Sequence, residues 1–233
     1  MSAESGSLSK DVPWEWIKAA RDIVKAEPRK QPDHLPVQLL PWLYLSDMPS
    51  ALKLSQNNPL DITAVLTTNK IFREDDLWGI TAEFAESDIR HGYVGGVDII
   101  GYDMMKYHWE DACKFIEESL NCSNGKEEAV GTPASPPKIL IHCAAGTNRS
   151  ALVAGAAMIA FGTLSSDDST HNSNHKDFTF IEVISILKKQ RGFVLNNIWF
   201  IRLLAEFAQQ RGQLGPKPDG YSKVALRKSE LII

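Results

Sequence analysis

The sequence has 233 residues, of which 43% are hydrophobic, so it can form the core of one domain with additional segments around it. Its formal net charge of −4 gives no general electrostatic attraction for nucleic acid or for an anionic membrane. An anionic ligand would therefore have to be bound by local donors rather than by the overall field of the protein.

The cysteine content favours a reducing environment. There are three cysteines, Cys113, Cys122 and Cys143, and their spacing matches neither a zinc site nor a disulfide framework. The first ten residues lack the apolar run of a secretory signal, and the apolar stretch 151–161 is too short to span a bilayer. We therefore expect a soluble protein of the cytoplasm, with the nucleus not excluded, and no membrane association.

The N-terminal half predicts alternating helices and strands. A helix is expected over 13–26, where Pro13 suits a first turn, and a proline-rich linker over 27–36. The stretch 38–46 predicts one strand, and the apolar run 62–67 predicts a strand buried on both faces. A short helix is expected between them, over 50–56. Residues 69–100 are predicted to be mixed strand and loop.

The next segment predicts helix, strand and helix. Apolar residues at helical spacing predict a helix over 102–120, and a polar loop follows over 121–137. Residues 138–142 predict a short apolar strand. The small, uniformly apolar residues of 151–161 predict a central helix.

The C-terminal segment predicts a polar surface insertion over 165–177 and two helices, 180–190 and 197–210. Alternation of strands and helices predicts an α/β fold, with a central mixed, mostly parallel sheet flanked by helices. The expected organisation is an N-terminal extension over 1–36, one main domain over 37–212 and a C-terminal tail over 213–233.

The stretch from Ile139 to Ser150 predicts an anion site. A buried strand ends at His142, a seven-residue loop runs from Cys143 to Arg149, and a helix begins at about Ser150. Successive backbone N–H groups in such a loop can form a concave nest, and the helix adds free N–H groups and the positive end of its dipole. The residues expected to line the anion are Ala144, Ala145, Gly146, Thr147, Asn148 and Arg149.

The same surroundings would activate Cys143 as a nucleophile. A free thiol has a pKa near ~8.5, so only about 3% is thiolate at pH 7. A helix N-terminus and the Arg149 guanidinium can lower this pKa by about 3 units. Ser150 is placed to donate a hydrogen bond to the sulfur when it leaves, and His142 to brace the loop. We therefore predict Cys143 as the nucleophile and Arg149 as the main anion clamp.

The order His, Cys, five residues, Arg, Ser resembles the signature of the protein tyrosine phosphatase superfamily, and its dual-specificity branch most closely. The resemblance extends over about residues 37–210 and includes the segments 42–46, 62–66, 112–120 and 191–200. It implies a phosphatase-type phosphate-binding loop, a phosphocysteine intermediate, no cofactor and no metal. It departs from the family pattern in the longer segments 121–137 and 165–177, and in Leu203, where Gln is common.

In this family an Asp on a neighbouring loop protonates the leaving group and then activates water. By position in the chain, Asp98 fits this role best. Asp103 is closer to the helix and is expected to cap it, and Asp88 is a third candidate.

Cys113 and Cys122 are interpreted as structural. The alternative is that one of them protects an oxidised Cys143 by forming a reversible disulfide.

The predicted function is hydrolysis of phosphotyrosine and phosphoserine or phosphothreonine esters in a phosphoprotein partner. The loop between Cys143 and Arg149 has no basic residue, which argues against a multiply phosphorylated inositol substrate. Two alternatives stay open: a phosphatase of RNA 5′-ends, phosphoinositides or phosphoglycans, and a pseudophosphatase that binds phosphoproteins without turnover. The pair Asn148 and Arg149 keeps the RNA alternative open, although nucleic acid is not the expected partner.

Overall fold

The computed structural model describes residues 12–27, 35–70, 74–121, 137–162 and 177–220, except for the side chains of 74–79. Most of the two expected polar segments, 121–137 and 165–177, lies outside the described residues, as does Cys122. Among the described residues, no helix combines the length and apolar character needed to cross a membrane.

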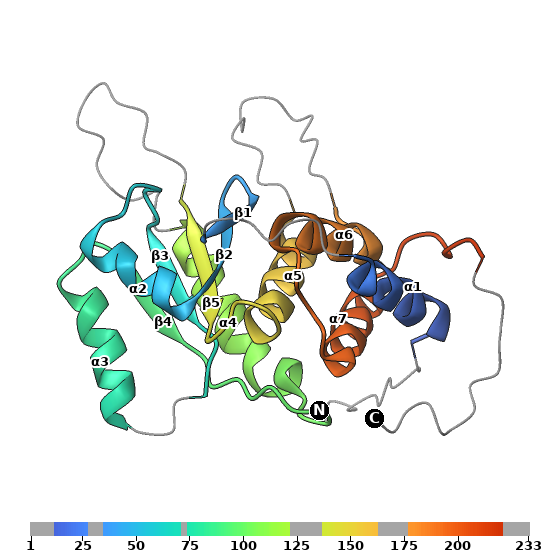
Figure 1. Ribbon diagram of the computed structural model, residues 1–233, viewed down its shortest axis with the longest axis horizontal. Coiled ribbons are helices and arrows are strands. Elements are labelled where there is room, and N and C mark those ends of the chain that lie inside the picture. The colour runs from blue at the N-terminus through green and yellow to red at the C-terminus, as the bar shows by residue number, and fades with distance from the viewer. Residues whose placement is uncertain (1–11, 28–34, 71–73, 122–136, 163–176, 221–233) are drawn as a thin grey trace, which may run out of the picture.

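The core of the fold is a five-stranded sheet with the strand order β1-β2-β5-β3-β4 (Figure 1). The strands are β1 (Val37–Leu40), β2 (Leu43–Asp47), β3 (Ala64–Thr67), β4 (Arg90–Tyr93) and β5 (Ile139–Cys143). The edge strand β1 is antiparallel to β2, and all other pairs are parallel. The predicted mixed, mostly parallel sheet is therefore confirmed.

The prediction of one strand over 38–46 is wrong, because this stretch folds back on itself as β1 and β2. Val37 pairs with Leu45 and Leu40 with Leu43, so Pro41 and Trp42 form the turn. Proline has no N–H to donate to a sheet ladder, which favours a turn at this position.

Helices cover both faces of the sheet, as predicted. They are α1 (Trp14–Lys25), α2 (Met48–Gln56), α3 (Glu74–Ala85), α4 (Met104–Asn121), α5 (Arg149–Phe161), α6 (Phe180–Arg191) and α7 (Ile198–Gln210). α2 and α3 pack on one face, and α4 to α7 lie on the other with α1 outside α6 and α7 (Figure 1).

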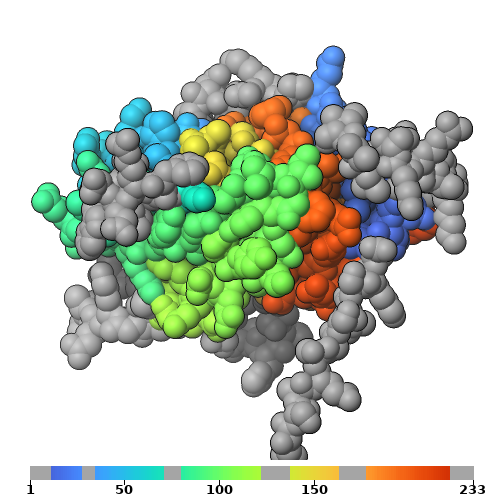
Figure 2. All heavy atoms as spheres, turned by 90° about the horizontal axis from the view of Figure 1, so that it is seen from below, coloured from blue at the N-terminus to red at the C-terminus, as the bar shows by residue number. Residues whose placement is uncertain are grey.

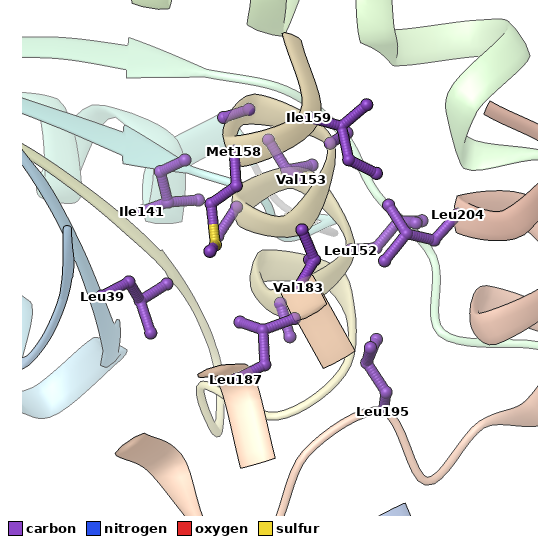
Figure 3. Close-up of a cluster of buried hydrophobic side chains, with 14 of the residues drawn as sticks. Leu39, Ile141, Leu152, Val153, Met158, Ile159, Val183, Leu187, Leu195 and Leu204 are labelled. Atoms are coloured by element: carbon purple, nitrogen blue, oxygen red, sulfur yellow. The ribbon is translucent and has the colours of Figure 1, made fainter. Parts of the chain in front are cut away.

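The central strand β5 contributes side chains to the cores on both faces of the sheet, because successive side chains of a strand point to opposite faces. Leu140 faces the α2 and α3 layer, while Ile139 and Ile141 face α5. Figure 3 shows α5 surrounded by apolar side chains from the sheet, α6 and α7. Ten of its residues are buried, from Ser150 to Ile159, which explains why the helix is apolar on all sides.

The helix α3 was not predicted within residues 69–100. Two residues of this helix, Ile80 and Phe84, lie one turn apart on its inner face. They are buried in the same apolar cluster as Ile89. Of that region only β4 is a strand, and it joins the sheet in parallel at the edge.

Candidate active site

The site forms where the parallel strands end. β2, β3, β4 and β5 run in the same direction, so the segments that follow them meet at one edge of the sheet. Ligand sites of open α/β sheets lie at this carboxyl edge. The loop between Cys143 and Arg149 joins β5 to α5 there.

The carbonyl groups of this loop are bound from outside. Ala144 O accepts from Met48 N at 3.3 Å, and Thr147 O accepts from Leu195 N at 2.9 Å. Gly146 adopts a φ of +65°, and a Cβ at this position would lie 2.6 Å from the carbonyl oxygen of Ser46. Only glycine fits this turn without displacing the end of β2.

Arg191 at the end of α6 holds the two middle carbonyls of the loop. Its Nε donates to Gly146 O at 3.2 Å and its Nη2 donates to Ala145 O at 3.1 Å. Burial lowers the pKa of Arg191, while the charges of Asp47 and Cys143 oppose that change. Sequence reasoning placed Arg191 in a family-like segment but did not assign this role to it.

The thiol of Cys143 lies inside the loop, and the residue is 1% exposed. Burial by itself raises the pKa of this thiol. The hydrogen bond from Ser150 Oγ at 3.2 Å, the N–H groups of Ser150 and Thr147 and the charge of Arg149 together outweigh burial, so the pKa of Cys143 is lowered. These N–H groups point at the sulfur, which is the arrangement of an anion nest.

The guanidinium of Arg149 is positioned by the segments that follow β3 and β4. Its Nη1 donates to the Asn69 side chain and, at 3.5 Å, to Gly96 O. Its buried Nε has no hydrogen-bond partner among the described residues. A buried unpaired donor calls for an acceptor, and an oxygen of a bound anion can supply one. Asn69 was missed, although the polar run Thr67, Thr68, Asn69 at the end of a buried strand could have indicated it.

Asp98 lies at the edge of the loop and is held by two amides. Its Oδ2 accepts from Asn148 Nδ2 at 2.8 Å, and its Oδ1 accepts from Asn197 Nδ2 at 2.9 Å. Asn148 Oδ1 in turn accepts from Asn197 N at 3.3 Å. The structure therefore brings Asp98 to the predicted loop and adds Asn197, whose contact sequence reasoning did not assign.

The two other acidic candidates are placed differently. Asp103 Oδ1 accepts from Lys106 N at 2.9 Å and so caps α4, as expected. Asp88 precedes β4, whose first residue Arg90 is level with Ile139 of β5. Cys143 is four residues farther along β5, or about 13 Å, so Asp88 lies toward the opposite edge of the sheet.

His142 is buried beneath the loop. Its Nε2 lies 2.8 Å from Thr67 Oγ1, which also lies 2.9 Å from His91 Nε2. Its backbone oxygen accepts from Thr68 Oγ1 at 2.9 Å. Burial lowers the pKa of each histidine to about 4, and for His142 the neighbouring His91 adds to this effect. Both rings are thus neutral near pH 7, which suits a bracing role rather than proton transfer.

These histidines predict a loss of stability in acid. Each pKa is about 4 in the folded protein and 6.5 when unperturbed, so the unfolded chain binds more protons as the pH falls below 6.5. Between pH 7.5 and pH 5, His142 alone should lower the free energy of unfolding by roughly 2 kcal/mol. Urea unfolding at the two pH values measures this, and His91→Gln should flatten the dependence. The same urea midpoint at pH 7.5 and pH 5 would contradict the conclusion that His91 and His142 are neutral in the folded protein.

Comparison with known proteins relates the chain to phosphatases. No family model matches the chain. Dual specificity protein phosphatase 26 of Rattus norvegicus is 30% identical over 169 residues, which are 72% of this chain and 65% of that protein. Over these residues the chain is similar to a dual-specificity phosphatase. It spans less than two thirds of the length of this curated relative.

Solved structures of the dual-specificity family and its neighbours show the same fold. Human DUSP28 matches with a TM-score of 0.55 at 16% identity, over 78% of this chain and 99% of that one. OH1 from the Orf virus, a tyrosine phosphatase by its description, matches with a TM-score of 0.54 at 15% identity, over 83% of this chain and 97% of that one.

Proposed function

We propose that this protein is a protein phosphatase that hydrolyses phosphotyrosine and phosphoserine or phosphothreonine esters through a phosphocysteine intermediate. The observation that carries the proposal is the position of Cys143, whose sulfur receives the N–H groups of Thr147 and Ser150 beside Arg149. This environment favours the thiolate, which is the nucleophilic form.

In the first step, the Cys143 thiolate attacks phosphorus and forms an S–P bond while the ester P–O bond breaks. Arg149 and the loop N–H groups stabilise the charge on the phosphoryl oxygens, and the unpaired Nε supports a two-pronged contact. Asp98 gives its proton to the departing oxygen.

In the second step, Asp98 takes a proton from water, whose oxygen attacks phosphorus. The S–P bond then breaks and releases inorganic phosphate. The electron pair returns to sulfur, where Ser150 Oγ, at 3.2 Å, stabilises the thiolate. The step restores both the thiolate and the protonated Asp98.

Asn148 bears on the alternative of an RNA 5′-end substrate. Its amide nitrogen donates to Asp98 and its oxygen accepts from Asn197, so both ends of the side chain are already in use. Since no basic residue lies between Cys143 and Arg149, a singly phosphorylated amino acid is the better-supported substrate. Nucleic acid, phosphoinositides and phosphoglycans are less well supported.

Phosphate release from one panel of substrates tests the proposal. The panel contains phosphotyrosine, phosphothreonine and phosphoserine peptides, phosphoinositides, a phosphoglycan and RNA with a 5′-triphosphate. We expect the highest kcat/KM for the peptides. Faster release from RNA or inositides would overturn the protein substrate, and peptide binding without any release would favour a pseudophosphatase.

The role proposed for Asp98 predicts a dependence on the leaving group. Asp98→Asn keeps an oxygen for Asn148 or Asn197 but has no proton to give. We expect kcat to fall about 10²-fold for an alkyl or phenyl phosphate and much less for an aryl phosphate with an acidic leaving group. Asp103→Asn is the matched control. A uniform loss, or none, would move the role to another residue.

We also infer a reducing cytoplasmic setting, with the nucleus as an alternative, because the mechanism needs Cys143 as a free thiolate. Cys113 and Cys143 are both free cysteines in the structure.

A further inference from the structure

Among the described residues, four large hydrophobic side chains are markedly exposed: Ile99 at 56%, Ile100 at 60%, Tyr107 at 58% and Phe193 at 45%. Single exposed apolar residues are ordinary on protein surfaces. These four side chains, which we call the apolar rim, belong to two segments of the chain. Both segments contact the Cys143–Arg149 loop. Their common location is what calls for an explanation.

The first segment follows β4. Ile99 and Ile100 come directly after Asp98, which accepts a hydrogen bond from Asn148 of the loop. Their Cα atoms therefore lie within about 8 Å of the Cα of Asp98 along the chain. Tyr107, in the first turns of α4, packs with its ring centroid 5.6 Å from that of Tyr102 and so continues this segment.

The second segment joins α6 to α7. Phe193 lies two residues after Arg191, which binds Gly146 O, and two residues before Leu195, whose N–H binds Thr147 O. Phe193 is thus fixed beside the loop from both directions. Leu195 has a φ of 50°, a conformation uncommon for a bulky residue, and is completely buried.

The two segments are joined to each other. Asn197 donates to Asp98 at 2.9 Å, and Trp199 Nε1 donates to Tyr102 O at 2.9 Å. In Figure 2, the green surface of the 100–121 region lies against the orange surface of the C-terminal helices. The rim is therefore built on segments that are positioned without a ligand, which lowers the entropy lost on binding.

We infer that the apolar rim binds apolar side chains on either side of the phosphorylated residue of a protein substrate. The inference rests on the proposed function, since a substrate that reaches Cys143 must bring its flanking residues next to these two segments. In the sequence Asp98 and Asp103 lie on either side of Ile99 and Ile100, which disfavours acidic flanking residues at this part of the rim, whereas Lys106 Nζ lies 5.6 Å from the ring centroid of Tyr107.

Three phosphotyrosine peptides test the inference. They differ only at the two positions before and the two after phosphotyrosine, which carry leucine, serine or glutamate. We expect kcat/KM to be about tenfold higher for leucine than for serine, and lowest for glutamate. p-Nitrophenyl phosphate, which has no flanking residues, is the reference in each assay.

Substitution of the rim shows whether the preference arises there. A variant with Ile99→Ser, Ile100→Ser and Phe193→Ser should reduce the leucine-to-serine ratio to about one. Lys53→Ser, on the exposed surface of α2, should keep the ratio. The affinities of the same peptides for Cys143→Ser protein, with and without the rim substitutions, give a second readout that does not need turnover.

Equal rates for the three peptides, a preference for glutamate, or a ratio that survives the rim substitutions would overturn the inference while the phosphatase proposal stands. Faster hydrolysis of a phosphoinositide in anionic vesicles, lost with the rim, would assign the rim to a membrane. Concentration-dependent dimerisation that the rim substitutions abolish would assign it to a second copy of the chain. Absence of turnover with p-nitrophenyl phosphate would overturn the phosphatase proposal itself, and the role of the rim with it.

Discussion

Cys143→Ser is expected to lower kcat/KM for every phosphate monoester substrate by at least about 10⁴-fold while a phosphopeptide still binds. A serine hydroxyl does not ionise near neutral pH, so the nucleophile is lost. The loop N–H groups and Arg149 are left in place, and these are the groups proposed to bind the phosphoryl oxygens. Steady-state kinetics and isothermal titration calorimetry with one phosphopeptide measure both effects.

Cys113→Ser is the matched control. Cys113 is the other free cysteine of the described residues, and burial raises the pKa of its thiol, so it is not an activated nucleophile. Its substitution should leave kcat/KM within about twofold of the natural protein. Substantial hydrolysis by the Cys143→Ser protein would rule out covalent catalysis through this sulfur.

Arg149→Lys is expected to reduce kcat/KM by about 10³-fold although the positive charge is kept. Lysine presents a single ammonium and cannot contact two phosphoryl oxygens in one plane. It also cannot reproduce the contact that the guanidinium makes with Asn69. Because lysine keeps the positive charge that helps to lower the pKa of Cys143, the pH dependence of thiol alkylation by iodoacetamide should change little, which separates the loss of the two-pronged contact from a loss of thiolate.

Arg202→Lys provides the comparison for this substitution. Arg202, on α7, pairs with Glu206 at 2.7 Å across one helical turn at the protein surface. Such a pair contributes little to stability, and we expect kinetics like those of the natural protein. If Arg149→Lys behaved in the same way, the two-pronged contact with phosphate would be wrong.

The local parts of the site could be predicted from the sequence because they are contiguous in it. A strand, a tight loop with glycine and a helix of small residues follow one another between Ile139 and Phe161, and each has its own signal. All the groups that lower the pKa of the Cys143 thiol belong to Thr147, Arg149 and Ser150, which lie within seven residues of Cys143. Because these residues are close to Cys143 in the sequence, their arrangement around the sulfur could be predicted.

The groups that hold the loop could not be predicted in the same way, because they come from distant segments. Arg191, Asn69 and Asn197 contact the site through pairings separated by 45 to 99 residues. The order and direction of the strands place Asn69, and the packing of α6 and α7 against α5 places Arg191 and Asn197. The same information separates Asp98 from Asp88, since it shows at which end of β4 each lies.

The secondary-structure errors also have physical causes. The turn at Pro41 and Trp42 lies within an apolar run that looks like one continuous strand. The run stays apolar across the turn because Trp42 is buried, with 3% of its surface exposed. The Trp42 Nε1 donates to Gly162 O, which anchors the turn against the end of α5. In α3 the charged residues at the start concealed a short apolar face formed by Ile80 and Phe84.

The most direct test is to trap the intermediate. The protein is mixed with a phosphotyrosine peptide, quenched in acid within milliseconds, digested and analysed by mass spectrometry. We predict one phosphorylated peptide, with the phosphoryl group on the sulfur of Cys143, formed as a burst before steady-state release of phosphate. Phosphate release with no phosphorylated Cys143 at any quench time would contradict the proposed chemistry.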